Sequence, residues 1–441
     1  MFGCVGVWVC RRMNASRPRL ASITRTILLV LAGTFFVVLL EGAVWADDGD
    51  VKWVDCTQGG TISYALRGSG DDPVTIIVKG TCNESVRIRR PRVTLKAATG
   101  GGTVSGLDPN SPAILITSED TVINGLAVSG GINGIHVRGA HRTSIRNCLI
   151  RFSTRSGILF SHSSEGTVDN CTVQNNGTHG ISINGSSASI FNSNISANTQ
   201  HGVFVAFGAN AFIGINPFPI PVYAGNTIAN NGANGMSVVD GGVAVIGGNA
   251  ISGNGTDTGS IRGRSGVNVG IRGAANLVGN NTIILNKGGG VVGSNGAVIF
   301  IGNPGFGLST LNTISQNNAA NLPGNGGITG FLGTSMAIQG AEITGNTGSG
   351  LTLSLRSTAQ IVGGGSMAIS NNTGNGILLA LGSGLFLSGP PPAPVAVTNN
   401  GTVFPLGWGI SCVDAESSFL GSTAGFSGNG LGSVNPNCTG F

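Results

Sequence analysis

The feature that most constrains the fold is a short motif that recurs eleven times along the chain. It reads glycine, an apolar residue, any residue and usually a second apolar residue, as in "NGIHV", "SGILF" and "HGISI". Successive glycines are 22 or 23 residues apart at the start of the series, and the longer intervals indicate one repeat plus an inserted loop. Because so short a unit cannot bury an apolar face alone, the repeats must stack into a solenoid. The motif glycines are Gly134, Gly157, Gly180, Gly202, Gly235, Gly266, Gly290, Gly327, Gly350, Gly376 and Gly409.

A second strand pattern lies within each repeat, as in "SIRNCLI", "TVDNCTV" and "LVGNNTI". Alignment on the final apolar residue gives one column of turn residues. Asparagine and glycine, which fill it, adopt the left-handed backbone region at low cost. The column therefore predicts a tight turn with positive φ, where stacked asparagine side chains can hydrogen-bond to the next repeat. Its members are Asn147, Asn170, Asn192 and Asn280, with Gly225, Gly248 and Gly340 in other repeats.

Short strands and turns in a repeat of this length describe one rung of a parallel β-solenoid, and helical periodicity is missing beyond the N-terminal segment. The motif, the asparagine column and the period resemble right-handed parallel β-helix proteins of the pectin-lyase-like superfamily. The stretch that begins "DCTQGGTISYALRG" resembles the N-terminal cap of exported members. We therefore predict an all-β chain with a cap at 47–84 and a right-handed parallel β-helix at 85–441. The resemblance does not specify function, because this fold hosts lyases, hydrolases, epimerases, adhesins and non-catalytic proteins.

Residues 1–46 have the organisation of a signal peptide. Arginines precede the apolar run "ILLVLAGTFFVVLL", and Val44 and Ala46 occupy the cleavage positions. The alternative is an uncleaved anchor, for which this run is short. We expect an exported protein, periplasmic, cell-surface or secreted, that meets a membrane only through this segment. Without its five arginines and one acid, 18 basic and 17 acidic residues remain, so charge gives no reason to expect a nucleic-acid partner.

Six cysteines follow this segment, and an even number in an exported chain favours disulfides. Cys56 with Cys82, and Cys412 with Cys438, would each close one end of the mature chain. The alternative is a set of buried free thiols. No pairing is predicted for Cys148 and Cys171.

The strands led by the motif glycine alternate inward and outward side chains. In the enzymes that the fold resembles, the substrate groove tends to lie over this strand face. A glycosidase needs two carboxylates across such a groove, and a calcium-dependent lyase needs several carboxylate ligands. Neither outward row contains an aspartate or a glutamate. Catalytic residues therefore stay unassigned, and no metal or cofactor is predicted. The first outward row is His136, Leu159, Ser182, Phe204, Ser237, Asn268, Val292, Thr329, Thr352, Leu378 and Ser411, and the second begins with Arg138 and Ser161.

The segment "NNGTHGISINGS" resembles the histidine segment of pectin-degrading hydrolases, whose motif reads Gly-His-Gly. His179 directly precedes the motif glycine, a position that Asn133, Ser156 and His201 hold in other repeats. We therefore interpret His179 as a turn residue that stacks near His201, not as a catalytic group.

A band of basic residues surrounds the first repeats and is the candidate polysaccharide-binding region. Bidentate arginine contacts there would attract a uronate or sulfated polymer. The alternative is a solvated edge beside the acidic segment that contains Asp71 and Asp72. The candidates are His136, Arg138, Arg142, Arg151, Arg155 and His162, preceded by Arg87, Arg89, Arg90, Arg92 and Lys96.

Two apolar, proline-containing stretches interrupt the repeat, Phe207–Tyr223 and Leu385–Val397. Because proline disfavours central strands, we expect both to be loops that project from the solenoid. The alternative is that they fold back as lids over the core.

Three functional hypotheses remain, of which an adhesin or passenger fragment is the third. The first is an exported, non-catalytic β-helix with a glycan-binding or structural role. The second is a polysaccharide lyase or uronate epimerase that uses Arg138 with His136 or His162. The enzyme hypothesis requires Glu165 or Asp169 to lie within reach of these groups.

Overall fold

The computed structural model describes residues 22–31, 34–43, 49–67, 71–216, 221–259, 263–302, 311–362, 367–388, 395–403 and 406–440. The chain divides into two compact units, Met1–Asp50 and Val51–Phe441. In the first unit, β1 (Ser22–Leu31) pairs antiparallel with β2 (Thr34–Ala43). The remainder of the predicted signal peptide, including its cleavage positions, lies outside the described residues, so cleavage stays a prediction. Among the described residues, no helix is long and apolar enough to span a bilayer.

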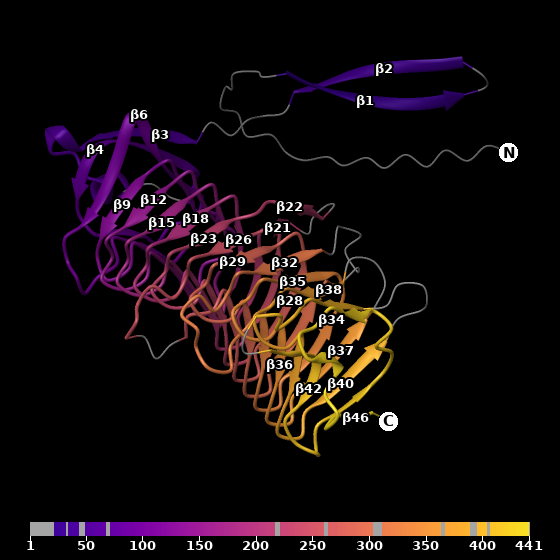
Figure 1. The fold of residues 1–441 in the computed structure, drawn as a ribbon. Coiled ribbons are helices and arrows are strands. Elements are labelled where there is room, and N and C mark those ends of the chain that lie inside the picture. The colour runs from indigo at the N-terminus through magenta and orange to yellow at the C-terminus, as the bar shows by residue number, and fades with distance from the viewer. Residues whose placement is uncertain are drawn as a thin grey trace. The chain divides into compact units, whose positions relative to one another are not determined.

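The second unit is a parallel β-solenoid (Figure 1). One side is a 14-stranded sheet that contains the strands led by the motif glycines. Its strands are β5 (Val86–Ile88), β7 (Ile114–Ile116), β10 (Ile135–Arg138), β13 (Ile158–Ser161), β16 (Ile181–Asn184), β19 (Val203–Ala206), β24 (Met236–Val238), β27 (Val267–Val269), β30 (Val291–Gly293), β33 (Ile328–Gly330), β36 (Leu351–Leu353), β39 (Ile377–Leu379), β42 (Trp408–Cys412) and β45 (Gly432–Val434).

The other sides belong to a 28-stranded sheet in which each regular rung contributes two strands. We call the strands before the asparagine turn the first stack. It comprises β4 (Val74–Asn83), β6 (Val93–Gly106), β8 (Val122–Asn124), β11 (Thr143–Arg146), β14 (Glu165–Asp169), β17 (Ser187–Phe191), β20 (Asn210–Ile213), β25 (Val243–Gly247), β28 (Ala274–Gly279), β31 (Val298–Ile301), β34 (Ser335–Ile338), β37 (Thr358–Val362), β40 (Gly384–Ser388), β43 (Ser418–Leu420) and β46 (Thr439–Gly440), with β3 (Asp50–Asp55) at its N-terminal edge.

The second stack follows the asparagine turn. It comprises β9 (Ala127–Gly130), β12 (Leu149–Arg151), β15 (Thr172–Gln174), β18 (Asn194–Ser196), β23 (Thr227–Ala229), β26 (Ala250–Ser252), β29 (Thr282–Ile284), β32 (Asn312–Ser315), β35 (Ala341–Thr344), β38 (Ala368–Ser370), β41 (Ala396–Thr398) and β44 (Phe426–Ser427). β4 and β6 are long enough to continue through both stacks.

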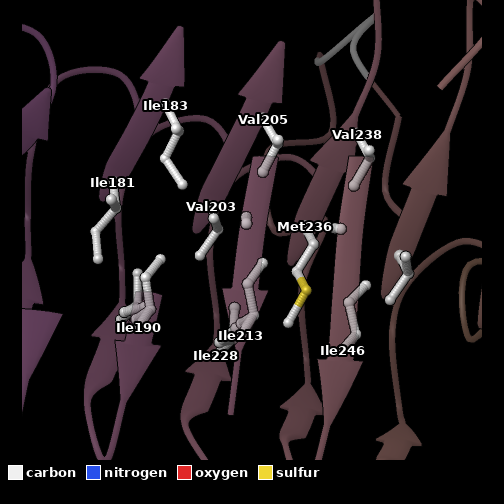
Figure 2. Packing of buried hydrophobic residues seen from close by; sticks show 14 of the residues in the cluster. Ile181, Ile183, Ile190, Val203, Val205, Ile213, Ile228, Met236, Val238 and Ile246 are labelled. Carbon is white, nitrogen blue, oxygen red and sulfur yellow. The ribbon is translucent and has the colours of Figure 1, made fainter. Parts of the chain in front are cut away.

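The core is a column of aliphatic side chains that point inward from all three strand sets (Figure 2). Ile181 and Ile183 of β16 are fully buried, and Val203 and Val205 occupy the same positions one rung later. Each rung thus covers the apolar face of its neighbour, which no rung could do alone. Several short outward residues are buried too, contrary to the expectation that their row faces solvent. Neighbouring rungs cover them, as where the Asn268 amide lies 3.3 Å from the Ser237 hydroxyl.

The predicted turn column lies between the two stacks. Asn147, Asn170, Asn192 and Asn280 have φ between 47° and 56°, and Gly248 and Gly340 also have positive φ. Asn170 Nδ2 donates to Asn147 Oδ1 at 2.8 Å, so neighbouring turns are linked. Gly225 is the exception, because an insertion enters this rung and Gly214, on the other side of it, takes the positive φ of 74°.

A second asparagine column, which the sequence analysis missed, lies between the second stack and the 14-stranded sheet. We call it the long asparagine ladder. Each member donates to the next through side-chain amides, and each is buried. This buried network is fully connected, the condition under which polar groups stabilise a core. The members are Asn176, Asn198, Asn231, Asn254, Asn286, Asn317, Asn346, Asn372, Asn400 and Asn429.

The ladder also explains the motif glycines. A Cβ atom added at Gly235 would lie 2.6 Å from Ile251 Cγ2 and 2.8 Å from Asn254 Nδ2. Glycine is required there because the buried amide and the core isoleucine fill the space that a side chain needs, not because of its backbone freedom.

The expectation that both insertions are loops throughout is wrong for parts of each. Asn210–Ile213 is β20, paired with β17 and β25, and Gly384–Ser388 is β40, paired with β37 and β43. Their apolar residues alternate with the period of a strand, and the prolines lie outside these segments. Beyond β20, β21 (Ile215–Asn216) pairs with β22 (Val222–Tyr223) as a small hairpin. Residues 217–220 and 389–394 lie outside the described residues.

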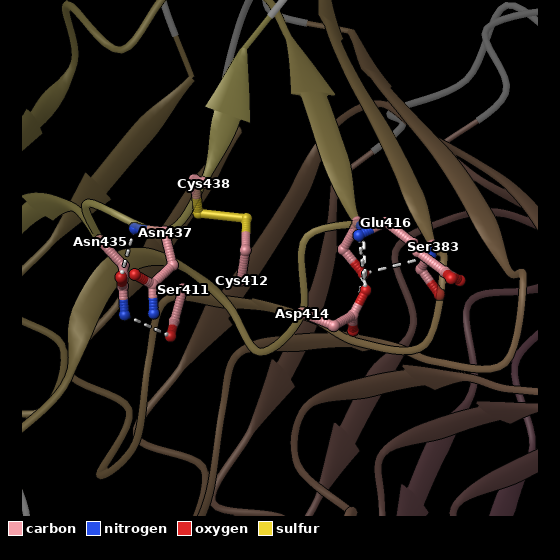
Figure 3. Close-up of a disulfide and its surroundings, with 9 residues drawn as sticks. Ser383, Ser411, Cys412, Asp414, Glu416, Asn435, Asn437 and Cys438 are labelled. Carbon is pink, nitrogen blue, oxygen red and sulfur yellow. Dashed lines mark hydrogen bonds between the residues drawn. A yellow bond between two sulfur atoms is a disulfide. The ribbon is translucent and has the colours of Figure 1, made fainter.

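The structure closes both ends of the solenoid with a disulfide. Cys56–Cys82 joins the short helix η1 (Cys56–Gln58) to β4, and α1 (Ile62–Ala65) places the buried Ile62 over the core. Cys412–Cys438 ties β42 to the C-terminal segment (Figure 3). Beside it, the Asp414 carboxylate accepts from the backbone N–H of Glu416 at 3.1 Å. Cys148 and Cys171 are buried free thiols.

Candidate functional site

The six basic candidates are distributed over three faces of the solenoid. His136 and Arg138 lie on β10, and His162 directly follows β13 in the same 14-stranded sheet. Arg142 precedes β11 of the first stack. Arg151 lies on β12 of the second stack, and Arg155 is in the turn before β13. The expected continuous basic band is therefore divided among these faces.

The histidines on the 14-stranded sheet are joined through a serine. Ser161 Oγ lies 2.8 Å from His136 Nε2 and 2.8 Å from His162 Nδ1. Burial, with the nearby charges of Arg138 and His162, lowers the pKa of His136 to about 4. His136 is therefore neutral at pH 7 and is suited to hydrogen bonding, not to pairing with an anion.

Two of the arginines already have partners. Arg142 donates from Nε to Asp120 Oδ1 at 2.6 Å and from Nη2 to Glu119 Oε2 at 2.5 Å. These contacts raise the pKa of Arg142 and lower that of Asp120. Arg151 lies over the ring of Phe152, 5.0 Å from its centroid.

The carboxylates that the enzyme hypothesis needs lie on another sheet. Glu165 and Asp169 belong to β14 of the first stack. Glu165 Oε2 is 3.8 Å from His141 Nδ1, and Asp169 Oδ1 accepts from Asn192 Nδ2 at 2.8 Å. The structure thus does not bring them together with His136, Arg138 and His162. Among the described residues, no three histidine, cysteine, aspartate or glutamate side chains are grouped to hold a metal ion.

His179 is part of an aromatic stack. Its ring centroid is 5.2 Å from that of His201 and 4.6 Å from that of Phe204, and the rings are within 9° of parallel. The predicted stacking with His201 is confirmed.

A groove of about 500 Å³ lies over the outer face of the first stack. Ser144, Thr167, Ser189 and Phe212 come from β11, β14, β17 and β20, and they follow one another in register across its floor. The groove is also lined by two charged residues, a second phenylalanine and two asparagines: Arg142, Glu165, Phe191, Asn210 and Asn216. Hydroxyls, amides and two half-buried phenylalanines therefore line one elongated depression.

The floor row continues beyond the groove as an uncharged surface. In the strand register, Phe212 is paired with Val245, Val245 with Asn276, and Asn276 with Phe300. From there the row leads through Ala337 and Gln360 to Phe386 and Leu420. Phenylalanine thus recurs on every third rung, about 14 Å apart at a strand spacing of 4.7–4.9 Å. Within the described strands from β17 to β43, this row contains no charged residue.

Sequence reasoning missed this groove because it assigned the substrate face to the 14-stranded sheet. The available signal was the outward residues of the second strand pattern, where Phe191, Phe212, Phe300 and Phe386 stand among small polar residues. The strand that carries Phe212 had instead been interpreted as a loop.

Comparison with known proteins agrees with the fold. Residues 101–217 match a family model described as the right-handed β-helix region. Among solved structures, the A-module of a mannuronan C-5 epimerase from Azotobacter vinelandii is 15% identical, with a TM-score of 0.47, over 85% of this chain and 92% of that one. A pectate lyase is 13% identical, with a TM-score of 0.41, over 66% of this chain and 78% of that one.

A family 28 exopolygalacturonase from Yersinia enterocolitica is 10% identical, with a TM-score of 0.34, over 96% of this chain and 84% of that one. A search of curated proteins finds no match. The strand topology and the family match over residues 101–217 together show that the chain has a right-handed parallel β-helix fold.

Proposed function

We propose that this chain is an exported β-helix protein that binds an uncharged polysaccharide in the groove over the first stack. The observation that carries the proposal is the lining of the groove, where Phe191 and Phe212 accompany a row of hydroxyl groups. Sugar rings offer apolar faces for aromatic side chains and hydroxyls for polar ones, and a concave site that combines both kinds of contact suits them.

The charges around the groove favour a neutral ligand over a uronate. Arg142 and Glu165 are the charged lining residues, and Arg142 is already bound to Glu119 and Asp120. The charge of Arg92 also acts on Asp120, so two cations and three carboxylates give this group a net charge of −1. A polymer of carboxylated sugars would be repelled there, whereas a neutral polymer would not.

The uncharged row that leaves the groove supports an extended ligand. Phe300 and Phe386 are 46% and 41% exposed, so both rings are accessible to a chain that runs along the solenoid. Each additional ring contact adds binding energy without new charge. Affinity should therefore increase with the length of the polysaccharide.

Binding to neutral and anionic oligosaccharides, measured by calorimetry on the purified protein, tests the proposal. We expect neutral xylo-, cello- or manno-oligosaccharides to bind more tightly than galacturonate or mannuronate oligomers. Phe212→Ala should weaken that binding by about tenfold or more, as loss of a central aromatic contact does. Phe152→Ala is the control, because Phe152 is an exposed ring that does not line the groove. Preference for uronates, or binding that Phe212→Ala leaves unchanged, would refute the proposal.

The same samples test the lyase alternative. Unsaturated uronate products absorb in the ultraviolet, so absorbance followed over time reports cleavage by elimination. Product formation that disappears in Arg138→Ala would establish a lyase on the 14-stranded sheet in place of a binding protein.

A further inference from the structure

A second cavity, of about 480 Å³, lies at the N-terminal end of the solenoid and is rich in arginine. Arg87 and Arg89 belong to β5 and the residue after it, and Arg90 is in the turn that leads to β6. Arg67 follows α1 and lines the same cavity. Two serines, Ser63 and Ser85, complete the polar lining.

The positive charge of this cavity is not neutralised by the ion pairs that the structure describes. None of those pairs includes one of the four arginines. The acid nearest in sequence, Glu84, is not part of the lining but lies beside it, since it accepts from the backbone N–H groups of Ile62 at 2.6 Å and Ser63 at 3.0 Å and from the Ser63 hydroxyl. Four arginines therefore line one cavity, and no carboxylate is part of its lining.

Arg90 gives a second, independent indication of a ligand. Its Nη2 atom donates to the backbone carbonyl of Asp72. Its Nε and Nη1 atoms are buried and have no hydrogen-bond partner among the described residues. A buried charged donor without a partner costs substantial free energy, and one oxyanion could accept from both nitrogens at once.

We propose that this arginine cavity, lined by Arg67, Arg87, Arg89 and Arg90, binds a phosphate-type dianion. Four cations favour a dianion over a carboxylate, which supplies a single negative charge. The planar guanidinium group matches the oxygens of a tetrahedral oxyanion in bidentate geometry. Inorganic phosphate and a phosphate monoester on a sugar share this chemistry. The site lies on α1, β5 and the turn after β5, so it is independent of the groove proposed for neutral glycans.

The test is thermal unfolding of the full chain in phosphate and in chloride at matched ionic strength, together with calorimetric titration. We expect phosphate to stabilise the wild-type protein and to bind Arg90→Gln at least about tenfold more weakly. In phosphate-free buffer, Arg90→Gln should unfold at the same temperature as the wild type or higher, because it removes an uncompensated buried charge. Arg155→Gln, an exposed arginine in a turn, is the control and should behave as the wild type.

Three results would overturn the proposal. If Arg90→Gln lowers stability equally with and without phosphate, Arg90 has a structural role only. If phosphate stabilises Arg90→Gln as much as the wild type, the stabilisation is a non-specific salt effect and not binding at Arg90. If acetate binds as tightly as phosphate, the cavity does not select a dianion over a carboxylate. Titration with glucose 6-phosphate distinguishes the two sources, because a cavity for sugar phosphates binds it at least as tightly as inorganic phosphate.

Discussion

The side-chain amide of Asn254 donates to the side-chain carbonyl of Asn286 at 2.9 Å, and the equivalent contact recurs on every rung between Asn176 and Asn429. Asn254 Oδ1 in turn accepts from the backbone N–H of Asn231, and Asn254 Nδ2 also donates to the carbonyl of Ile228. Asn254 Oδ1 also accepts from the Asn231 side-chain amide at 3.0 Å, so one side chain satisfies four neighbouring polar groups. The long asparagine ladder holds successive rungs in register where the chain turns into the 14-stranded sheet.

Replacement of a central ladder residue should therefore destabilise the whole solenoid. Asn254→Ala leaves the backbone N–H and side-chain amide of Asn231 without their acceptor. Each buried group that loses its partner costs about 1–3 kcal/mol. We expect the free energy of unfolding, measured by denaturant titration, to fall by about 2–4 kcal/mol.

The control is Asn268→Ala, which removes a partly exposed amide that contacts only Ser237 among the hydrogen bonds described. It should change stability by less than about 1 kcal/mol. Equal losses in the two variants would show that the ladder contributes nothing beyond an ordinary hydrogen bond.

The motif glycines should tolerate no side chain. In Gly235→Ala the new methyl group would lie 2.7 Å from the carbonyl oxygen of Gly266 and 2.6 Å from a methyl of Ile251. Overpacking of this kind costs about 1–3 kcal/mol, and backbone contacts cannot move aside easily. Thermal unfolding of Gly235→Ala compared with Gly259→Ala checks this. The second substitution meets only the Asp257 carboxylate at 3.5 Å and should be close to neutral.

Much of the fold was predictable because it repeats. The eleven motif glycines predicted the repeating rung, and the asparagine column predicted the turn with positive φ. The long asparagine ladder also left a signal, since asparagine precedes the motif glycine by four residues in pairs such as Asn176 and Gly180. That spacing did not predict the ladder, because the sequence analysis related asparagine only to left-handed turns. The ladder members instead stabilise the fold through their buried side-chain amides.

The candidate site was less predictable for a geometric reason. Alternation specifies which side chains of a strand face outward, but it does not indicate which of the three outer faces is hollow. The groove depends on Phe212 and Asn216, which lie in or beside an insertion that interrupts the period. That such residues line one groove with Ser144, which is three rungs from Phe212, cannot be inferred from spacing within one repeat.

Cys171 should be replaceable by serine but not by valine. Its backbone N–H donates to Ser193 Oγ at 3.1 Å, and Cys171 Sγ lies 3.5 Å from the backbone nitrogen of Cys148. At this position of successive rungs, a side chain thus accepts from the backbone N–H of the preceding rung. Cys171→Ser retains an acceptor and should stay within about 1 kcal/mol of the wild type, while Cys171→Val should lose about 1–2 kcal/mol.

Thiol reactivity gives a second measurement on this pair. The hydrogen bond with Cys148 and burial raise the pKa of the Cys171 thiol. Because the thiolate is the reactive form, alkylating reagents should label this cysteine only after unfolding. Labelling of the native protein at Cys171, mapped by mass spectrometry, would contradict the buried geometry.

Protonation of the buried His136 should be visible in the pH dependence of the free energy of unfolding. Burial, Arg138 and His162 lower the pKa of His136 to about 4 in the folded protein. An unfolded histidine has a pKa of about 6.5, so between pH 6.5 and 4 the unfolded state holds more protons than the folded state. The stabilising contribution is complete above about pH 6.5 and is lost progressively as the pH falls to about 4.

The pH range in which His136 affects stability can be separated from the range in which the carboxylates titrate. The Asp55 carboxylate, with hydrogen bonds from Thr57 and Lys79, has a pKa lowered to about 2, so its contribution is lost only at more acidic pH. Between pH 6.5 and 4, His136→Gln should therefore remove up to one proton from the slope of unfolding free energy against pH. The imidazole resonances of His136, followed by NMR, should titrate near pH 4. A midpoint near 6.5 would show that this ring is accessible to solvent and that its link to Ser161 does not hold it neutral.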